Sequence, residues 1–131
     1  MAYADQVAAV EKAVRAAIAE TVTAFPVRLW GDNASELKSA PVAAYVHAEA
    51  ETPATLARQI VRCAVTVRSA ATADPDRSKL EAACAAVEAA TPGDLTLQQG
   101  AAVAPQGWGP LELTADQFLV RSLTLRVFVH F

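Results

Sequence analysis

The most regular hydrophobic pattern in the chain lies between Gln117 and Phe131. Alternate positions of this stretch are apolar apart from Arg121, and the positions between them are mixed. The apolar set is Leu119, Leu123, Leu125, Val127, Val129 and Phe131. A period of two over β-prone residues, without Gly or Pro, is typical of a strand that buries one face. We therefore predict one long strand here, and we expect the rest of the fold to be arranged around it.

A helical pattern covers the first part of the chain, from about Tyr3 to Ala24. Its apolar positions recur at intervals of three and four residues: Val7, Val10, Val14, Ala17, Ile18 and Val22. Charged residues take the other side, and Glu11 with Arg15 makes a favourable i,i+4 pair. Abundant alanine raises helix propensity further, so we predict an amphipathic helix over this range.

A second helix is predicted from about Pro75 to Ala90. Its apolar stripe consists of Leu80, Ala83, Cys84 and Val87. Asp74 precedes it, and an aspartate at this place accepts hydrogen bonds from unpaired backbone N–H groups as the N-cap, with Pro75 at the first helical position. Thr91-Pro92-Gly93 ends the pattern.

Two alternating segments follow the first helix. Phe25–Trp30 favours a short strand, with Pro26 near its start, where no hydrogen-bond donor is needed. Pro41–Glu51 has apolar residues at its even positions, which is typical of a half-buried strand. We predict that the two strands pair as a hairpin around the polar connection between Gly31 and about Ala40. The residues Ser35–Lys38 are compatible with a helical turn inside that connection.

Three further strands are predicted on either side of the second helix. Ile60–Ser69 alternates between an apolar side and a basic, polar side. Leu95 and Leu97 favour a short strand that passes through Gln98-Gln99 into a Gly- and Pro-rich loop, Gly100–Pro110, which carries Trp108. Leu111 and Leu113 are consistent with a short edge strand.

The grouping of helices and strands predicts an α+β fold in which a mainly antiparallel sheet has two helices packed on one face. A chain of 131 residues is expected to form a single domain, residues 1–131. The other face of the sheet would be the mixed face, which carries Arg62, Arg68 and Arg126.

Composition narrows the class of protein. A hydrophobic content of 53% with 19% charged residues excludes disorder, and no apolar run approaches the ~20 residues of a membrane-spanning helix. We therefore expect a soluble globular protein. Much of the hydrophobic content is alanine, which buries little area per residue. The predicted core is correspondingly thin, and self-association would supply the missing burial.

Net charge and cysteine usage narrow the class of protein further. A formal net charge of −3 argues against a protein built to grip nucleic acid or an acidic membrane. The first residues lack a basic region followed by an apolar core, so we expect no secretory signal. Cys63 and Cys84 lack CxxC spacing and fall on apolar sides of their elements, which predicts reduced thiols in a cytosolic compartment.

Residues with catalytic potential are few and isolated. His47 and His130 lie on polar sides of predicted strands without the partners of a catalytic or metal site, so we predict no catalytic, cofactor or metal residues. Trp108 is either a contact anchor or a side chain folded back onto its own core. The arginines of the mixed face either line a nucleic-acid path or solvate the sheet. The second interpretation is favoured, since we expect no aromatic residues among them.

Three patterns and the order of elements resemble the tail terminator, or tail-completion, proteins of long-tailed phages and phage-like particles. The first is the opening helix, Val7 to Val22, which leads through a strand to the proline-led segment Pro41–Val46. The second is Arg62–Val67, followed by a helix that contains Leu80–Ala83. The third is the arginine-led closing strand Arg121–Val127. The match covers nearly the whole chain, except the region around Trp108.

This resemblance implies a structural α+β virion subunit that assembles as a homo-hexameric ring at the head-proximal end of the tail tube, in the neck region. The ring would stop tube polymerisation, contact the tail tube protein and the head–tail connector protein, and let DNA pass through its lumen without specific binding. Assembly would take place in the host cytoplasm, without catalysis, cofactor or membrane. The alternatives are a head–tail connector or stopper, and a small ligand-binding or enzyme subunit with its site on the mixed face.

The residues that we predict at an assembly interface belong to the large aromatic and basic side chains outside the apolar stripes. They are Trp30, Arg62, Arg68 and Trp108.

Overall fold

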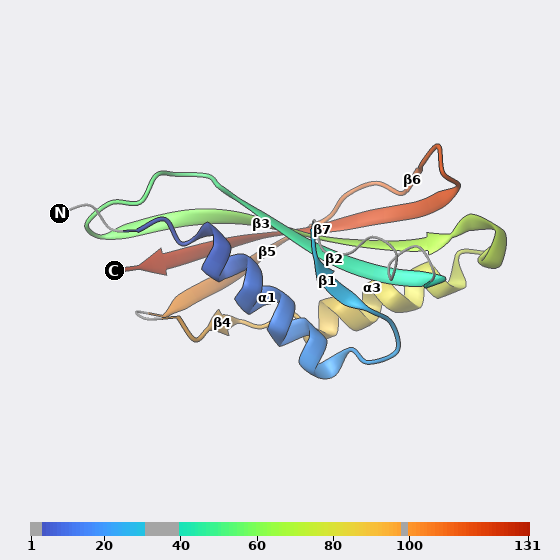
Figure 1. The fold of residues 1–131 in the computed structure, drawn as a ribbon, viewed down its shortest axis with the longest axis horizontal. Coiled ribbons are helices and arrows are strands. Elements are labelled where there is room, and N and C mark those ends of the chain that lie inside the picture. The colour runs from blue at the N-terminus through green and yellow to red at the C-terminus, as the bar shows by residue number, and fades with distance from the viewer. Residues whose placement is uncertain (1–3, 31–39, 98–99) are drawn as a thin grey trace.

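The computed structural model describes residues 4–30, 40–97 and 100–131 (Figure 1). Its helices are α1 (Val7–Thr21), the 3-10 turn η1 (Ala71–Ala73) and α3 (Ser78–Ala90). Its strands are β1 (Val27–Leu29), β2 (Val42–Ala50), β3 (Arg58–Ala70), β4 (Asp94–Leu95), β5 (Ala101–Trp108), β6 (Glu112–Leu113) and β7 (Phe118–His130). The fold is α+β, as predicted.

The sheet is built around β7. Its strand order is β1-β2-β3-β7-β5-β4, and β6 pairs with β7 as well. The ladder between β3 and β7 is antiparallel and runs from Arg58 opposite His130 to Ala70 opposite Phe118. Three strands thus use β7 as their partner, so the predicted central role of the C-terminal strand is confirmed.

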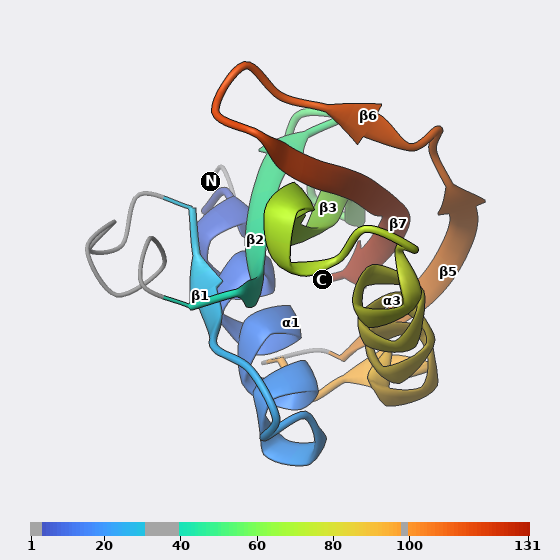
Figure 2. The ribbon, with the colours of Figure 1, turned by 90° about the vertical axis from the view of Figure 1, so that its right-hand side faces the viewer.

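Both helices pack on the same face of the sheet, inside its curve (Figure 2). Val10, Val14 and Ile18 of α1 and Leu80 and Val87 of α3 join one buried cluster with the inward residues of the strands. The predicted layer arrangement is therefore confirmed. None of the helices among the described residues is long and apolar enough to cross a membrane.

The predicted hairpin between the first two strands is wrong, because β1 and β2 run parallel. Val27 lies opposite Ala44 and Leu29 opposite Val46. The chain between them, residues 30–41, is long enough to return to the same end of the sheet, which a parallel pair requires. Most of this connection, including the helical turn suggested at Ser35–Lys38, lies outside the described residues.

The predicted Gly- and Pro-rich loop is also wrong, since most of it forms the strand β5. Val103 donates its backbone N–H to the Gly93 carbonyl at 3.0 Å, on the side away from β7. Pro105 has the same orientation, so its missing N–H costs no hydrogen bond to β7. A register shift follows between Pro105 and Gly107, where Gly107 has a φ of 104°. The glycine and the proline mark a bulge and a sheet edge, and Gln98-Gln99 lies outside the described residues.

Asp74 caps α3, as predicted, but the helix begins at Ser78 and Pro75 lies before it. A turn through Arg77, which has a φ of 62°, separates the carboxylate from the helix. The buried side chain of Asp74 accepts hydrogen bonds from the backbone N–H groups of Lys79 and Leu80, each at 2.9 Å. It also accepts one from the Ser69 hydroxyl at 2.9 Å. These bonds fix the start of α3 to the end of β3.

The start of α1 is held by Gln59, a fully buried polar residue of β3. Its side-chain oxygen accepts the backbone N–H of Gln6 at 2.9 Å, and its amide nitrogen donates to the Asp5 carboxylate at 2.7 Å. The same nitrogen lies 3.3 Å from the Thr52 carbonyl oxygen. The backbone N–H of Gln6, which has no partner within the helix, and the buried amide of Gln59 thus provide each other with a hydrogen-bond partner.

Replacement of Gln59 by leucine tests this link. Gln59→Leu keeps the size of the side chain but leaves buried polar partners without hydrogen bonds, so the free energy of unfolding should fall by about 2 kcal/mol. Urea denaturation followed by circular dichroism measures the change. Gln106→Leu, at an exposed position of β5, is the control and should shift it by less than about 0.5 kcal/mol. Equal stabilities of the two variants would contradict the role given to Gln59.

Asp74 predicts an acid-sensitive helix start. Burial by itself raises the pKa of Asp74, but hydrogen bonds from Lys79, Leu80 and Ser69 outweigh it and leave the pKa below its usual value. The carboxylate therefore contributes its full stability above pH ~4, the usual range of a free aspartate, and loses it as the pH falls through the lower native pKa.

We expect Asp74→Ala to lower the free energy of unfolding by about 1 to 2 kcal/mol at pH 7, the usual cost of losing a helix cap. The difference from the unmodified protein should shrink as the pH falls from 5 to 2. Denaturation curves at a series of pH values measure it, with Asp94→Ala, at an exposed aspartate, as the control. A difference independent of pH would contradict the assignment.

Candidate interaction face

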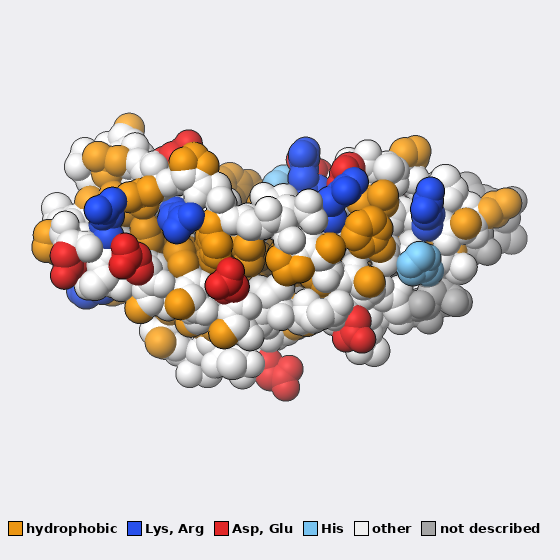
Figure 3. All heavy atoms as spheres, turned by 180° about the vertical axis from the view of Figure 1, so that it is seen from behind, with side chains coloured by type: hydrophobic (Ala, Val, Ile, Leu, Met, Phe, Trp, Pro, Cys, Tyr) orange, Lys and Arg blue, Asp and Glu red, His pale blue; other side chains and the backbone are white. Residues whose placement is uncertain are grey.

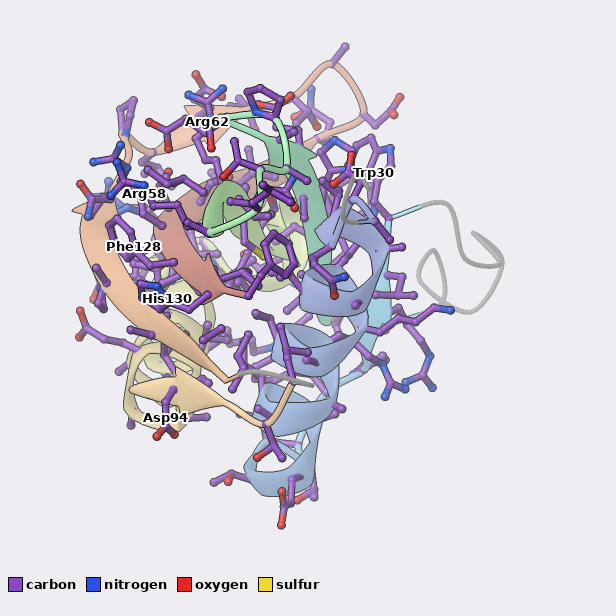
Figure 4. The ribbon with its side chains drawn as sticks, turned by 90° about the vertical axis from the view of Figure 1, so that its left-hand side faces the viewer. Trp30, Arg58, Arg62, Asp94, Phe128 and His130 are labelled. Atoms are coloured by element: carbon purple, nitrogen blue, oxygen red, sulfur yellow. The ribbon has the colours of Figure 1, made fainter. Side chains whose placement is uncertain are left out.

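The sheet surface away from the helices is exposed, and we call the outer surface of β1, β2, β3 and β7 the open face. Residues opposite one another in neighbouring strands share a face, which fixes its members. Its charged and aromatic residues are Arg28, Trp30, Tyr45, Glu49, Glu51, Arg58, Arg62, Arg68, Phe118, Arg126 and Phe128, together with His47 and His130. Figure 4 shows Trp30 at one margin, Arg58, Phe128 and His130 at the other, and Arg62 between them.

Two ion pairs cross the open face. The Arg62 guanidinium lies 2.6 Å from the Glu49 carboxylate. Arg126 binds Glu51 through two parallel hydrogen bonds of 2.9 and 2.6 Å. These bonds lower the pKa of Glu51 and raise that of Arg126. Both pairs are solvent-exposed, so they orient the side chains and contribute little to stability.

Aromatic rings lie among these arginines, contrary to our expectation. The Arg68 guanidinium carbon is 4.4 Å from the centroid of the Phe118 ring and 6.0 Å from that of Tyr45. Trp30, 59% exposed, lies 5.0 Å from Tyr45 between ring centroids. These separations are in the range of cation–π and aromatic pairing. The arrangement could not be seen in the sequence because the rings come from β2, from β7 and from the residue after β1, which are far apart along the chain.

Two hollows flank Arg62 on this face. The larger has a volume of about 510 Å³, and its walls include Arg62, Arg126, Glu51 and the backbone bend at Gly107. The smaller, of about 230 Å³, is lined by His47, Glu49, Arg62, Ala64 and Thr124. Both are shallow features of a sheet surface with guanidinium and carboxylate groups at their rims. They suit contact with a polar protein surface better than enclosure of a small molecule.

The predicted interface residues fall on two sides of the molecule. Trp30, Arg62 and Arg68 lie on the open face. The indole of Trp108 packs against the core and donates from Nε1 to the Glu88 carboxylate of α3 at 3.3 Å. The Arg121 guanidinium lies 5.6 Å from its ring centroid. Of the two interpretations of Trp108, the structure has the one folded onto its own core.

The histidines lie apart from each other. His47 is half exposed, with its Nδ1 3.7 Å from Oε2 of Glu11 on α1, and the same oxygen accepts the backbone N–H of Ala48 at 2.8 Å. His130 is exposed at the end of β7, opposite Arg58. Across residues 4–30, 40–97 and 100–131, no group of three or more His, Cys, Asp and Glu side chains is placed to hold a metal ion. The contact of His47 with Glu11 was not visible in the sequence, because it joins a helix to a strand edge.

Both cysteines are buried, free thiols. Burial, and secondarily the negative charge of Glu11, raise the pKa of Cys63 to about 12. Burial also raises the pKa of Cys84. Because the thiolate is the reactive form, neither side chain is a competent nucleophile near neutral pH.

Thiol labelling tests this state. At pH 8 the folded protein should react with an aromatic disulfide reagent at least about 100-fold more slowly than the chain unfolded in urea, where both thiols become accessible. Absorbance of the released thiolate measures the rate. Cys84→Ser identifies the contribution of Cys63. Rapid reaction of the folded protein would show that one thiol is exposed and activated.

Comparison of the sequence with models of known protein families and with curated proteins finds no match. The geometry of the open face and the order of elements are therefore the grounds for a functional proposal. What this face offers chemically is a rigid, folded surface with exposed aromatic and guanidinium groups, suited to contact with another macromolecule.

Proposed function

We propose that the protein is a tail terminator of a long-tailed phage or phage-like particle, a structural subunit whose ring caps the tail tube and provides the docking surface for the head. The open face carries the proposal. It exposes Trp30, Tyr45 and several arginines on a sheet backed by two helices, and its described residues include no lysine. Trp, Tyr and Arg are the residue types that dominate protein interfaces, whereas Lys is depleted there.

The positions of the three sequence patterns also support this proposal. Pro41–Val46 leads into and forms most of the first half of β2, Arg62–Val67 lies in the middle of β3, and Arg121–Val127 lies in β7. These strands are neighbours in the order β2-β3-β7. The strand parts of the three patterns therefore lie side by side in one sheet, and their helical parts, in α1 and α3, pack on its inner face.

The charge balance of the chain agrees with a neck through which DNA passes without specific binding. Arg62 and Arg126 each have a glutamate partner at 2.6 Å, which offsets their charge locally. Tight binding to a phosphate backbone depends on clustered Lys and Arg that release counterions. The overall net charge of −3 acts in the same direction.

A head–tail connector or stopper is the second candidate, supported by the same surface. Both roles need a subunit that contacts other neck proteins, and the identity of the neighbour separates them. A terminator touches the tail tube protein, whereas a connector touches the ring on the portal side. Cross-linking mass spectrometry of purified necks distinguishes the two.

Deletion and complementation in the particle that encodes this chain test the proposal. Particles without the protein should contain tubes of irregular length and heads without tails, because nothing ends polymerisation or joins the parts. The unmodified chain should restore normal particles in electron micrographs. Normal tail length and normal head joining without the protein would overturn the proposal.

A variant with Trp30→Ala and Arg62→Ala should fold normally but restore fewer than about one tenth of the particles, since interface anchors of this kind cost about 2 kcal/mol or more each. Circular dichroism and urea midpoints check folding. Asp116→Ala, at an exposed position of the turn before β7, is the control and should restore particles fully. Full restoration by the open-face variant would remove this face from the proposed role.

A further inference from the structure

Charge is divided unevenly between the open face and the rest of the described residues. The open face carries five arginines and two glutamates, Glu49 and Glu51, a formal excess of three positive charges. The remaining described residues carry five basic and ten acidic side chains, a formal excess of five negative charges. Figure 3, a view from behind, shows Lys and Arg mostly along the upper, sheet side, with Asp and Glu both among them and below them towards the helices.

The surface opposite the open face is formed by α1, α3 and β4, and we call it the helix side. These three elements carry five acidic and three basic side chains, a formal excess of two negative charges. Figure 4 shows Asp94 of β4 on the side of the molecule opposite to Arg62, beside the lower turns of α1. Asp94 and Glu20 are exposed there and have no ion-pair partner among the described residues. On the open face, Arg58 is exposed and likewise has no ion-pair partner among them.

Two parts of the sheet edge are closed to the addition of another strand. On β5, Pro105 has no N–H to offer on the side away from β7, and the bulge at Gly107 bends the strand. On β2, beyond the end of β1, the N–H of Ala48 already donates to the Glu11 carboxylate at 2.8 Å. Association through backbone pairing is therefore opposed at these two places.

We propose that the open face binds the helix side of a second copy of this chain. The inference rests on the proposed function and adds the way in which neighbouring subunits meet. Arg58 and Arg62 of one copy would lie against Asp94 and Glu20 of the next, with Trp30 at the margin of the contact. Two different surfaces meet in such a heterologous contact, and it generates a closed ring when the rotation between copies closes. A contact between two open faces would set positive surfaces against each other.

The chemistry favours a protein surface over nucleic acid as the occupant. Glu49 and Glu51 lie among the arginines, and a phosphate backbone placed there would meet their carboxylates. A mixed acidic surface of the same chain offers carboxylates for Arg58 and methylene and alanine groups for the exposed aromatic rings. Such complementarity contributes mainly to specificity and to the rate of association.

Charge reversal tests the contact. Variant A carries Arg58→Glu and Arg62→Glu, and variant B carries Asp94→Lys and Glu20→Lys. Each alone presents like charges on both meeting surfaces, so its self-association constant should fall at least about tenfold. An equimolar mixture, and a chain that combines all four changes, should recover association. Sedimentation velocity at low and high salt measures this, and Asp116→Lys, at an exposed position of the turn before β7 and outside both surfaces, is the control that should associate like the unmodified chain.

A photo-cross-linking amino acid at position 62 tests the same contact inside assembled particles. This experiment also tests the contact if the copies associate only on the tail. Cross-links should join position 62 to peptides from α1, α3 or β4 of another copy. Cross-links to DNA, to a different protein or to the open face of another copy would overturn the inference. In the charge-reversal experiment, a mixture of variants A and B that recovers neither association nor particle assembly would also overturn it.

The two proposals fail separately. Loss of tail termination on deletion, together with cross-links from position 62 to another protein, would keep the terminator role and remove the self-contact. Cross-links to the helix side in particles whose tails stay normal without the protein would keep the self-contact and remove the terminator role.

Discussion

The backbone ladder between β3 and β7 is the interaction on which the rest of the structure depends. Both strands are 13 residues long and pair along their whole length. Their inward side chains, among them Val65, Val67, Leu123 and Leu125, are almost fully buried beneath the helices. Because side chains alternate along a strand, burial of this row forces the intervening row onto the opposite surface. The same alternation that builds the core therefore presents Arg62 and Arg126 side by side to the outside.

The helices are attached to this ladder by polar contacts as well as by apolar packing. The Gln59 side chain accepts a backbone hydrogen bond from the start of α1, and the Asp74 carboxylate accepts one from the start of α3. Gln59 belongs to β3, and Asp74, which follows η1, accepts a hydrogen bond from Ser69 of β3, so a single strand orients both helices. The inward side chains are small, mostly valine and alanine. Directional hydrogen bonds at the two helix starts add to this apolar packing and set where each helix begins on the sheet.

The sequence predicted those parts of the fold that have a clear period. The opening helix, the C-terminal strand and the segment Ile60–Ser69 each have one period over many residues, and each was found where the pattern placed it. The direction of β1 was missed because a period of two is the same in parallel and antiparallel strands. The strand β5 was missed because Pro105 and Gly107, normally signs of a loop, occupy an edge and a bulge. The aromatic residues of the open face could be assigned to one surface only once the strand order was known.

Glu11 has a consequence for the behaviour of the chain at high concentration. A carboxylate from a helix takes the place that the carbonyl of a further strand would occupy beside Ala48. The helix thus acts as a terminal stop for the growth of the sheet, and it does so with a single side chain. Solubility, and not only packing, then depends on the length of that side chain. A shorter acid at this position would not reach Ala48, and its backbone N–H would be available to pair with a strand of another molecule.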